Sequence, residues 1–313
     1  MPLSEAQRAE IETARSARSE TRRATVPALE DMLFQALPVL DHGFVRVIDY
    51  MGDDAAVVQA ARVSYGRGTR KVSEDKALIK YLMRHRHSTP FEMCELKLHV
   101  KLPIFVARQW IRHRTANVNE MSARYSILDN EFYIPAPHDL AAQSQVNNQG
   151  RGTVLSGNEA HTVLDMLRDE AARSYSTYEE LMREDAEAGK LGLARELARM
   201  NLPTNIYTQW YWKVDLHNLF HFLRLRADAH AQFEIRAYAE VICDIVKSWV
   251  PLAYRAFEDY RMNAVTLSSM EIEALREYFA ACQPDREHDG WPEPKGLSER
   301  ESGEFFRKLG LMK

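Results

Sequence analysis

The chain has 313 residues, of which 45% are hydrophobic and 27% are charged, and its formal net charge at pH 7 is −4. This composition is typical of a soluble globular protein with enough apolar side chains for a sizeable core. The slightly acidic balance argues against a general nucleic-acid-binding protein, because such proteins are usually basic.

The sequence also gives no sign of a membrane or of an oxidising compartment. No run of 18 apolar residues occurs, and the first 25 residues are rich in Glu, Arg, Ser and Thr instead of forming an apolar leader. The three cysteines, Cys94, Cys243 and Cys282, are far apart and lack the spacing of a metal site. We therefore expect a cytoplasmic protein with no membrane partner.

The first third of the chain predicts short helices around two strands. In chain order these are a surface helix at 4–20, an amphipathic helix or turn at 28–37, a strand at 44–50, and helices at about 53–62 and 73–86. Residues 94–102 then alternate apolar and polar side chains, the pattern of a strand with one buried face. This alternation makes Cys94 a core residue and not a nucleophile.

The rest of the chain predicts mainly helices. The expected elements are a helix from Pro103 to Trp110, a loop or frayed helix end at 115–122, a strand at 132–134, helices at 158–188 and 193–201, an aromatic turn at 205–212, and one long helix from about Leu216 to Trp249. Two capping boxes, Ser268 with Glu271 and Ser298 with Glu301, predict helices in the tail.

We divide the chain into three parts on this basis. Residues 1–42 are expected to be an N-terminal helical extension, residues 43–262 the main domain with a polar insertion at 139–158, and residues 263–313 a C-terminal helical appendage.

A cationic segment lies in the main domain. From 108 to 124 the chain has four arginines, Arg108, Arg112, Arg114 and Arg124, against one acid, Glu120. Guanidinium groups bind phosphates in a bidentate manner, and the neighbouring amide and hydroxyl side chains are suited to a base or sugar. The segment therefore predicts a nucleotide-like anion as ligand, with a solvated basic surface as the alternative.

The predicted long helix carries polar groups on two faces. His217, His221, Arg224 and Asp228 follow helical spacing along one stripe, whereas Arg226 lies among apolar residues about half a turn away. An arginine in an apolar stripe needs a partner, because a buried unpaired charge is costly. That partner is either a structural ion-pair acid or a ligand.

Four motifs in order along the chain carry a resemblance to a known family. They are His87-Ser88-Thr89-Pro90-Phe91-Glu92, the stretch Pro103 to Trp110, Arg112-His113-Arg114 followed by seven residues and Ser122-Ala123-Arg124-Tyr125, and Leu225-Arg226-Ala227-Asp228-Ala229-His230-Ala231-Gln232. Together they resemble the flavin-dependent thymidylate synthases over about residues 43–260.

The resemblance implies a fold and a reaction. The fold is α/β (α+β), a mixed sheet flanked by long helices and rich in helix, with additional N- and C-terminal helical appendages. In the reaction dUMP is methylated at C5, 5,10-methylenetetrahydrofolate donates the carbon, and FAD reduced by NADPH supplies the hydride. The resemblance further implies a methyltransferase without a cysteine nucleophile. It also implies a homotetramer with active sites at subunit interfaces, and an enzyme that needs no metal and binds no nucleic acid.

Site residues follow from the matching positions. The implied dUMP group is Gln109, Arg112, Glu120, Met121, Ser122, Arg124, Arg199 and Arg226, with Arg226 as the catalytic residue that orients and activates the base. The implied FAD group is Thr89, Arg112, His113, Arg114, Glu120, Asp215, His217 and His221, with His87 and Glu92 as lesser candidates. The chain departs from the family where Asp215 and His217 replace the expected Asn or Arg, and where His221 replaces an amide.

Two other interpretations remain open from the residues alone. His217 and His221 have metal-ligand spacing on a helix, and His85, His87 or His230 would complete the site of a metal-dependent nucleotide hydrolase. The arginine cluster with Trp110 and Tyr125 also fits a non-catalytic nucleotide-binding or RNA-binding protein.

Overall fold

The structure is a computed structural model that describes residues 4–63, 72–145, 150–282 and 294–309. The chain forms two compact units, Met1–Met262 and Asn263–Lys313.

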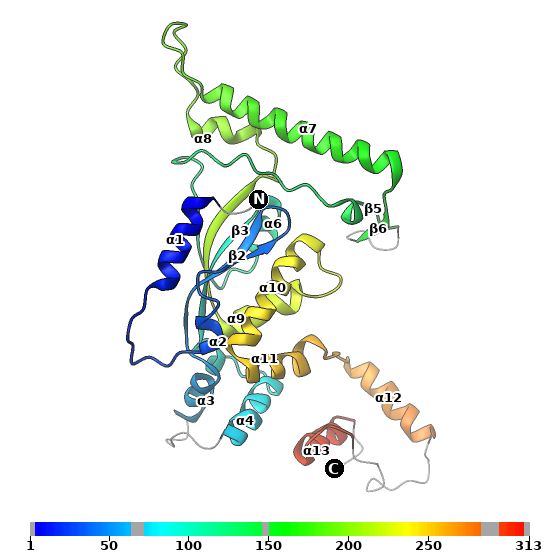
Figure 1. Ribbon diagram of the computed structural model, residues 1–313. Coiled ribbons are helices and arrows are strands. Elements are labelled where there is room, and N and C mark those ends of the chain that lie inside the picture. The colour runs from blue at the N-terminus through cyan, green and yellow to red at the C-terminus, as the bar shows by residue number, and fades with distance from the viewer. Residues whose placement is uncertain (1–3, 64–71, 146–149, 283–293, 310–313) are drawn as a thin grey trace. The chain divides into compact units, whose positions relative to one another are not determined.

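A five-stranded sheet forms the centre of the first unit (Figure 1). Its strands lie in the order β1 (Ala36–Val39), β2 (Gly43–Met51), β3 (Glu95–Pro103), β7 (Tyr207–Asp215) and β4 (Asn117–Glu120). Each of these neighbouring pairs is antiparallel. The helix-rich α+β class is therefore confirmed, and the expected mixed sheet has only antiparallel neighbours among its described strands.

Helices surround this sheet. Those of the first unit are α1 (Glu5–Ser16), α2 (Pro27–Glu30), α3 (Asp54–Val63), α4 (Val72–Arg84), α5 (Thr89–Glu92), α6 (Ile104–Trp110), α7 (Gly157–Met182), α8 (Arg195–Ala198), α9 (Leu216–Arg226), α10 (Phe233–Trp249) and α11 (Pro251–Phe257). Short 3₁₀ turns lie at η1 (Pro137–Asp139) and η2 (Arg199–Asn201), and a π-helical turn, η3 (Glu258–Met262), follows α11. Helices α6, α9 and α10 contact the strands, which places α9 and α10 against the sheet in Figure 1.

The predicted alternation of β3 is confirmed. Leu96, Leu98, Val100 and Leu102 are fully buried, and Cys94, directly before the strand, is buried with them. Residues on one face of a strand repeat every second position, so these side chains lie on one side of the sheet. They form the wall of the main core on which the helices pack.

Aromatic side chains join α6 to the sheet. Trp110 is fully buried, and its ring lies 5.7 Å from that of Trp210, 5.1 Å from that of Trp212 and 4.6 Å from that of Phe222. Such pairs bury large apolar areas and each adds about 0.5–1.5 kcal/mol beyond area burial. They fix the C-terminal end of α6, where the cationic segment begins.

Two segments expected to be irregular are strands. Residues 207–215, the greater part of which was predicted as an aromatic turn, form β7 beside β3, and part of the predicted loop at 115–122 forms the edge strand β4. The reason lies in pairing, because β3 and β4 satisfy the backbone groups of β7 on both sides. Trp210, Trp212 and Val214 are buried and alternate with less buried residues, the pattern of a strand with one buried face.

The predicted long helix is two helices. It ends at Arg226 and begins again at Phe233, so Asp228 lies outside any helix. The Asp228 carboxylate accepts hydrogen bonds from the His230 backbone N–H at 2.8 Å and pairs with the His230 ring. Aspartate side chains that bond nearby backbone groups compete with helix formation, which accounts for the break.

The N-terminal segment is not wholly a helical extension. Residues 36–39 form β1, and Leu29 is fully buried in the main core, so the latter part of 1–42 belongs to the sheet and its packing. The predicted strand at 132–134 is reduced to a single bridge between Phe132 and Ile206.

The polar insertion contains a small hairpin. Strands β5 (Ala141–Gln143) and β6 (Arg151–Val154) pair with each other, and Arg151 contacts the buried carboxylate of Glu234 on α10. Tyr133 also donates to Glu234 at 3.0 Å. The insertion is therefore anchored to α10 by hydrogen bonds.

The second unit consists of helices α12 (Ser269–Cys282) and α13 (Glu299–Lys308). The predicted capping boxes at both N-termini are confirmed: Glu271 and Glu301 accept from the backbone of Ser268 and Ser298, whose hydroxyl groups accept in return. Arg276 of α12 donates to the Leu309 carbonyl at 2.9 Å, which joins the two helices.

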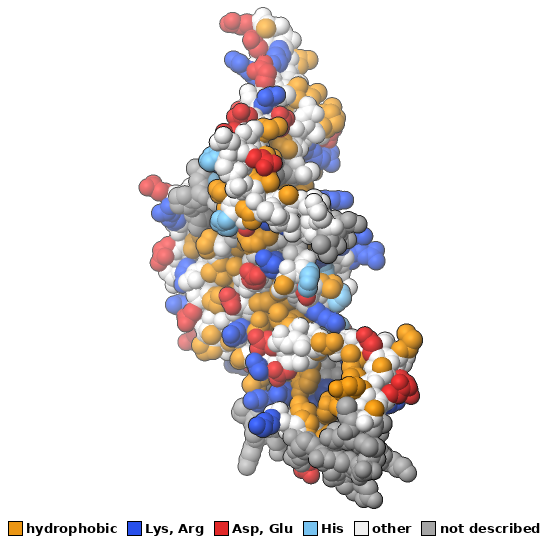
Figure 2. Space-filling view, turned by 90° about the vertical axis from the view of Figure 1, so that its right-hand side faces the viewer, with side chains coloured by type: hydrophobic (Ala, Val, Ile, Leu, Met, Phe, Trp, Pro, Cys, Tyr) orange, Lys and Arg blue, Asp and Glu red, His pale blue; other side chains and the backbone are white. Residues whose placement is uncertain are grey.

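Charged side chains of both signs are interspersed on the face drawn in Figure 2. Within the described ranges, no helix is both long and apolar enough to cross a membrane.

Candidate active site

The arginine segment and the end of α9 line one cleft. Arg112, His113 and Arg114 lie in the turn between α6 and β4, because α6 ends at the buried Trp110. Arg226 and His221 approach from α9, and Trp212 of β7 forms part of the wall. The cleft has a volume of about 400 Å³. Five of the predicted site residues therefore meet in one place.

Arg226 is paired with a neutral histidine. Its Nε donates to Nε2 of His113 at 3.1 Å. Burial, with the positive charge of Arg226 next in importance, lowers the pKa of His113 to about 4, so the imidazole accepts this bond at neutral pH. Burial also lowers the pKa of Arg226 from its usual value. The protein partner of Arg226 is thus the neutral ring of His113 and not an acid. This contact leaves the positive charge of the guanidinium uncompensated.

Two further cations stand at this cleft. Arg112 and Arg114 are exposed, and neither forms an ion pair with any residue that the structure describes. Because no carboxylate neutralises them, they are available to bind an anion. The cleft is suited to a ligand with negative charge and polar edges.

A second group of the predicted residues lies beyond β4. Arg124 pairs with Glu196 at 3.1 Å, and Arg199 donates to the Glu196 backbone carbonyl at 3.4 Å. The Ser122 hydroxyl accepts from the Arg124 backbone N–H. Arg124, Arg199 and Ser122 are therefore neighbours. The strand β4, whose four residues span about 13 Å, lies between them and Arg114 along the chain.

Glu120, Met121 and Gln109 each contact a different neighbour. Glu120 accepts from the Thr208 hydroxyl at 2.8 Å, and the Met121 backbone N–H donates to Gln209 at 2.8 Å. The side chain of Gln109 contacts that of Gln232, immediately before α10. These contacts hold the segment after β4, and the end of α6, against their neighbours.

Thr89 and Asp215 lie at the starts of two helices. Thr89 is the first residue of α5. The Asp215 carboxylate caps α9, because it accepts from the backbone N–H of Asn218 at 2.9 Å and from its side chain at 2.7 Å. Asp215 is therefore occupied in fixing the helix that presents His217, His221 and Arg226.

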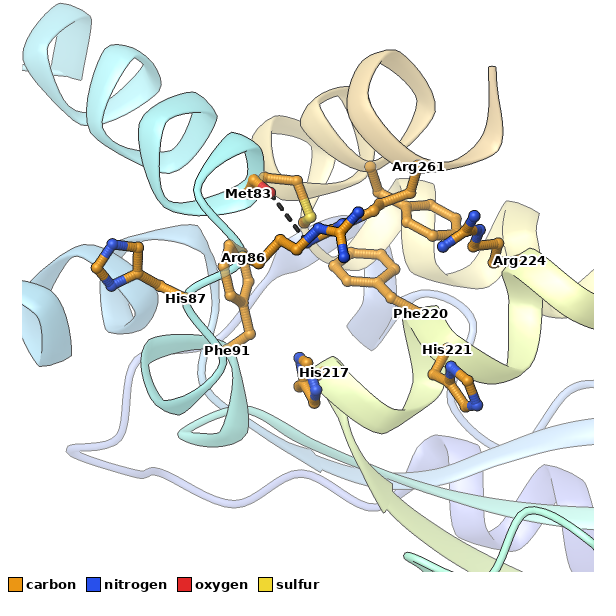
Figure 3. A pocket seen from close by; sticks show the side chains of 10 residues that line it. Met83, Arg86, His87, Phe91, His217, Phe220, His221, Arg224 and Arg261 are labelled. Atoms are coloured by element: carbon orange, nitrogen blue, oxygen red, sulfur yellow. Dashed lines mark hydrogen bonds between the residues drawn. The ribbon is translucent and has the colours of Figure 1, made fainter. Parts of the chain in front are cut away.

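A second pocket lies on the other side of His221 (Figure 3). Its volume is about 210 Å³, and His217, His221 and Arg224 line it from α9. Arg86 and Arg261 also line it, and sequence reasoning assigned them no role. Their signal was weak, since they lie 175 positions apart by the numbering and only the packing of η3 beside α4 brings them together.

The cysteines have no nucleophilic setting where the structure describes their side chains. Burial, with the nearby Asp53 and Asp54, raises the pKa of Cys94 to about 12, and burial raises the pKa of Cys243 to about 11. A thiol with such a pKa is almost entirely protonated at neutral pH and is a poor nucleophile. The side chain of Cys282 lies outside the described residues.

The histidine pair lacks further metal ligands. Among the described side chains, no group of three or more His, Cys, Asp or Glu residues is arranged to hold a metal ion. His217 and His221 therefore stand without the third ligand that the hydrolase alternative requires.

Comparisons with known proteins identify the family of the chain. The family described as "Thymidylate synthase complementing protein" matches residues 46–252. A flavin-dependent thymidylate synthase of Ruegeria pomeroyi is 65% identical over 310 residues, which is 99% of this chain and 100% of that protein. The enzyme of the same name from Gluconobacter oxydans is 60% identical over 99% of each chain.

A solved structure is also similar. The UMP/dUMP methylase PolB from Streptomyces cacaoi, bound with 5-Br UMP, superposes with a TM-score of 0.62 at 30% identity, covering 72% of this chain and 99% of that one. The same values hold for its structure bound with 5-Br dUMP. Since the family pattern covers most of the chain and the relatives match nearly all of it, this chain belongs to the flavin-dependent thymidylate synthases, a family of methyltransferase enzymes.

Proposed function

We propose that this protein methylates dUMP at C5 to form dTMP, with 5,10-methylenetetrahydrofolate as carbon donor and NADPH as the source of reducing equivalents. The observation that carries the proposal is the Arg226 guanidinium, desolvated and bonded to a neutral His113 in a cleft lined by two further arginines. Membership of the family and the nucleotide named in the similar PolB structure support it.

The substrate phosphate is assigned to the group beyond β4. Arg124, Arg199 and the Ser122 hydroxyl are neighbours, and such groups form charge-assisted hydrogen bonds with phosphate. Arg124 exchanges its contact with Glu196 for the phosphate. Gln109, Glu120 and Met121 complete the dUMP group, as the matching positions imply.

The base is assigned to Arg226. A guanidinium in a desolvated site stabilises negative charge more than it does in water, because less solvent screens it. Placed against the uracil edge, Arg226 stabilises charge on the pyrimidine and so increases electron density at C5. His113 accepts from Nε of Arg226, which leaves the terminal N–H groups of this cleft-lining arginine for the base. The base is thereby activated without a covalent bond to cysteine, consistent with the raised pKa of Cys94.

The residues also fit FAD. A flavin dinucleotide carries a pyrophosphate, and Arg112 and Arg114 are exposed cations without a carboxylate partner among the described residues. Thr89, His113, Glu120, Asp215, His217 and His221 complete the proposed FAD group. When bound, the flavin supplies the hydride that completes the methyl group. The arginines hold the phosphates, and the neutral His113 adds no positive charge beside them.

We further propose a cytoplasmic homotetramer. In one chain the base group at Arg226 contacts His113, which precedes β4, whereas the phosphate group at Arg124 follows β4. An active site that joins Arg226 of one subunit to Arg124 of another brings both groups to one nucleotide. The exposed edge strand β4 is available for such an interface, since all four of its residues are exposed in the single chain.

The reaction is tested by tritium release from dUMP labelled at C5, with methylenetetrahydrofolate and NADPH, in the presence and absence of added FAD. We expect flavin-dependent release that falls about 100-fold or more in Arg226→Ala, because one stabilising donor group is removed from the site. A well-folded, flavin-loaded protein that releases no tritium would disprove the proposal.

Two further variants sharpen this test. Arg226→Lys keeps the positive charge but loses the planar guanidinium, so we expect its rate of tritium release to remain far below that of the wild type. The Arg168→Ala variant on α7 removes an exposed, ion-paired arginine and should retain full activity. If Arg226→Lys were as active as the wild type, charge alone would suffice and the proposed orienting role would be wrong.

A further inference from the structure

The motif that ends at Gln232 contains a side chain that the proposed function does not use. Gln232 occupies the N-cap position of α10, where Ser, Thr, Asp and Asn are favoured because their side chains bond to the first backbone N–H groups of a helix. The Gln232 side chain makes no such capping bond. Its amide lies between the side chains of Glu234 and Gln109. Because Gln109 belongs to the proposed dUMP group, Gln232 connects that group to α10.

The Glu234 carboxylate, at the other end of this connection, is buried. Only 3% of its side chain is exposed, and its two oxygen atoms have different partners. Oε1 accepts from the Tyr133 hydroxyl at 3.0 Å and from Arg151, whereas Oε2 accepts from the Gln232 amide nitrogen at 2.8 Å. Burial, with the Glu234 charge next in importance, raises the pKa of Tyr133, so the tyrosine hydroxyl stays protonated and donates.

The chemistry of these groups fixes the orientation of both amides. A carboxylate only accepts hydrogen bonds, so the Gln232 atom that faces Glu234 is the nitrogen and the oxygen is turned to Gln109. That oxygen accepts from the Gln109 amide nitrogen. The Gln109 amide oxygen then has no hydrogen-bond partner in the part of the chain that the structure describes. The buried carboxylate therefore determines which end of the Gln109 amide is available to a ligand.

We propose that Glu234 is a positioning residue, which acts through Gln232 so that Gln109 presents its amide oxygen, and not its nitrogen, to dUMP. This inference rests on the proposed function, because the matching positions place Gln109 in the dUMP group. An oxygen acceptor recognises a hydrogen-bond donor of the substrate. The uracil and sugar of dUMP offer two such donors, the N3–H of the base and the 3′-hydroxyl.

The variant Glu234→Gln should reverse the two amides. Tyr133 and Arg151 continue to donate to the oxygen of the new side chain, so its nitrogen takes the place of Oε2. Gln232 then turns its oxygen to this nitrogen, and Gln109 turns its own nitrogen to dUMP. Since two donors now face each other, the dissociation constant of dUMP should rise about tenfold in isothermal titration calorimetry with the flavin-loaded protein.

A double-mutant cycle separates this positioning role from a structural one. Gln109→Ala removes the amide that contacts dUMP and should by itself weaken dUMP binding about fivefold to tenfold. In this background Glu234→Gln should cause no further loss of affinity, because no amide remains for it to orient. A structural defect would instead weaken binding equally in both backgrounds.

Two more variants control for folding. Tyr133→Phe removes a donor to Oε1 and leaves the bond from Gln232 to Oε2, so its melting temperature should fall while its affinity for dUMP stays that of the wild type. Gln232→Leu breaks the connection at an exposed position and leaves the buried carboxylate unchanged. It should weaken dUMP binding in the wild-type background but not in Gln109→Ala, and it replaces Glu234→Gln if that variant does not fold.

Two analogues identify which donor of the substrate Gln109 meets. The 2′,3′-dideoxy form of the nucleotide lacks the 3′-hydroxyl, and N3-methyl dUMP lacks the N3–H. The analogue without the donor that contacts Gln109 should bind the wild type and Gln109→Ala with equal affinity. The other analogue should keep the preference for the wild type.

Four results would overturn the inference. They are wild-type dUMP affinity in folded Glu234→Gln, an equal loss of affinity with and without the Gln109 amide, a loss in Tyr133→Phe as large as that in Glu234→Gln, and a preference for the wild type that both analogues keep. Failure of the proposed function is distinguishable, because the wild-type protein would then neither bind dUMP nor release tritium from it.

Discussion

His99 and His113 are both held neutral by burial beside arginines. Arg46 contacts Nδ1 of His99 at 3.0 Å, and Nε2 of His99 contacts the side-chain oxygen of Gln209 at 3.0 Å. Because arginine always donates, Nδ1 is the acceptor and Nε2 carries the proton. Burial, then Arg46, lowers the pKa of His99 to about 4. Each ring therefore acts as a fixed acceptor for a guanidinium.

The lowered pKa values predict a loss of stability in acid. Between pH 6.5 and 4 the unfolded chain binds protons at these histidines that the folded protein does not, so the free energy of unfolding falls as the pH falls through this window. His99 alone contributes on the order of 2 kcal/mol to this change. Urea unfolding of His99→Gln at pH 4.5 and 7 should show a smaller difference than the wild type. An equal pH dependence would contradict the assignment.

Cys94 is expected to be structural. Its thiol donates to the Asp53 carbonyl at 3.5 Å and its pKa is raised, so it is not available as a nucleophile. Cys94→Ala should retain wild-type tritium release and lose about 1 kcal/mol of unfolding free energy, because a small buried group is removed. Activity assays and urea unfolding measure the two effects separately. A large loss of activity in a stable Cys94→Ala protein would overturn the mechanism without cysteine.

At the scale of elements, close approach of β2 to α10 and β3 depends on Gly43. A Cβ atom on this residue would lie 2.0 Å from the Tyr238 hydroxyl and 2.8 Å from the Lys101 carbonyl. The Tyr238 hydroxyl donates to that same carbonyl at 2.7 Å. A side chain at 43 would therefore break this hydrogen bond and push α10 away from the sheet.

Gly43→Ala should lower the unfolding free energy by about 1–3 kcal/mol, the usual range for overpacking, with the lost hydrogen bond adding to it. Thermal unfolding followed by circular dichroism measures the effect. Gly303→Ala in α13 is the matched control, because a Cβ there meets nothing within 4 Å and alanine favours helix. Equal stability of Gly43→Ala and the wild type would show that α10 moves without cost.

The helix break at 227–232 has a consequence for the site. It makes Arg226 the last residue of α9, and it lets Gln232 precede α10 and contact Gln109 on α6. A continuous helix would carry residues 227–232 away from α6 along its axis. The break therefore brings the end of the Leu225 to Gln232 motif to Gln109, near the start of the cationic segment.

At the scale of the whole molecule, the two compact units differ in whether they contain proposed site residues. Every proposed site residue lies in Met1–Met262, and the contacts described for α12 and α13 include capping boxes and the Arg276 bond to Leu309. We propose that residues 43–262 carry the chemistry and residues 263–313 form a separate appendage. The first part of the chain is not separable in the same way, because β1 belongs to the sheet.

Removal of residues 263–313 should leave flavin content, tritium release and the thermal unfolding of the first unit unchanged, because its core and its site residues remain. Absorbance of bound flavin and the activity assay check this outcome on the shortened chain. Loss of bound flavin would show that the appendage contributes to the site. Removal of residues 1–42 should by contrast unfold the sheet, since β1 and Leu29 would be lost.

The proposed site residues could be named from the sequence, because the motifs that carry them are local. The RHR segment, Ser122 and Arg226 are recognisable by residue type and spacing, and β3 by its alternation. Capping boxes were equally predictable, since each depends on residues three positions apart. These features need only short stretches of chain to be specified.

Only the tertiary structure shows the features that depend on contacts between distant parts of the chain. The strands β7 and β4 form because β3 and one another supply their hydrogen-bond partners, and the sequence of a strand does not say which distant segment pairs with it. The neutral partner of Arg226 is His113, 113 positions away, and the pocket of Arg86, Arg224 and Arg261 exists only where α4, α9 and η3 meet. Burial sets the charge of His113 and the potential of that pocket, and burial is a property of the packed molecule, not of the sequence pattern.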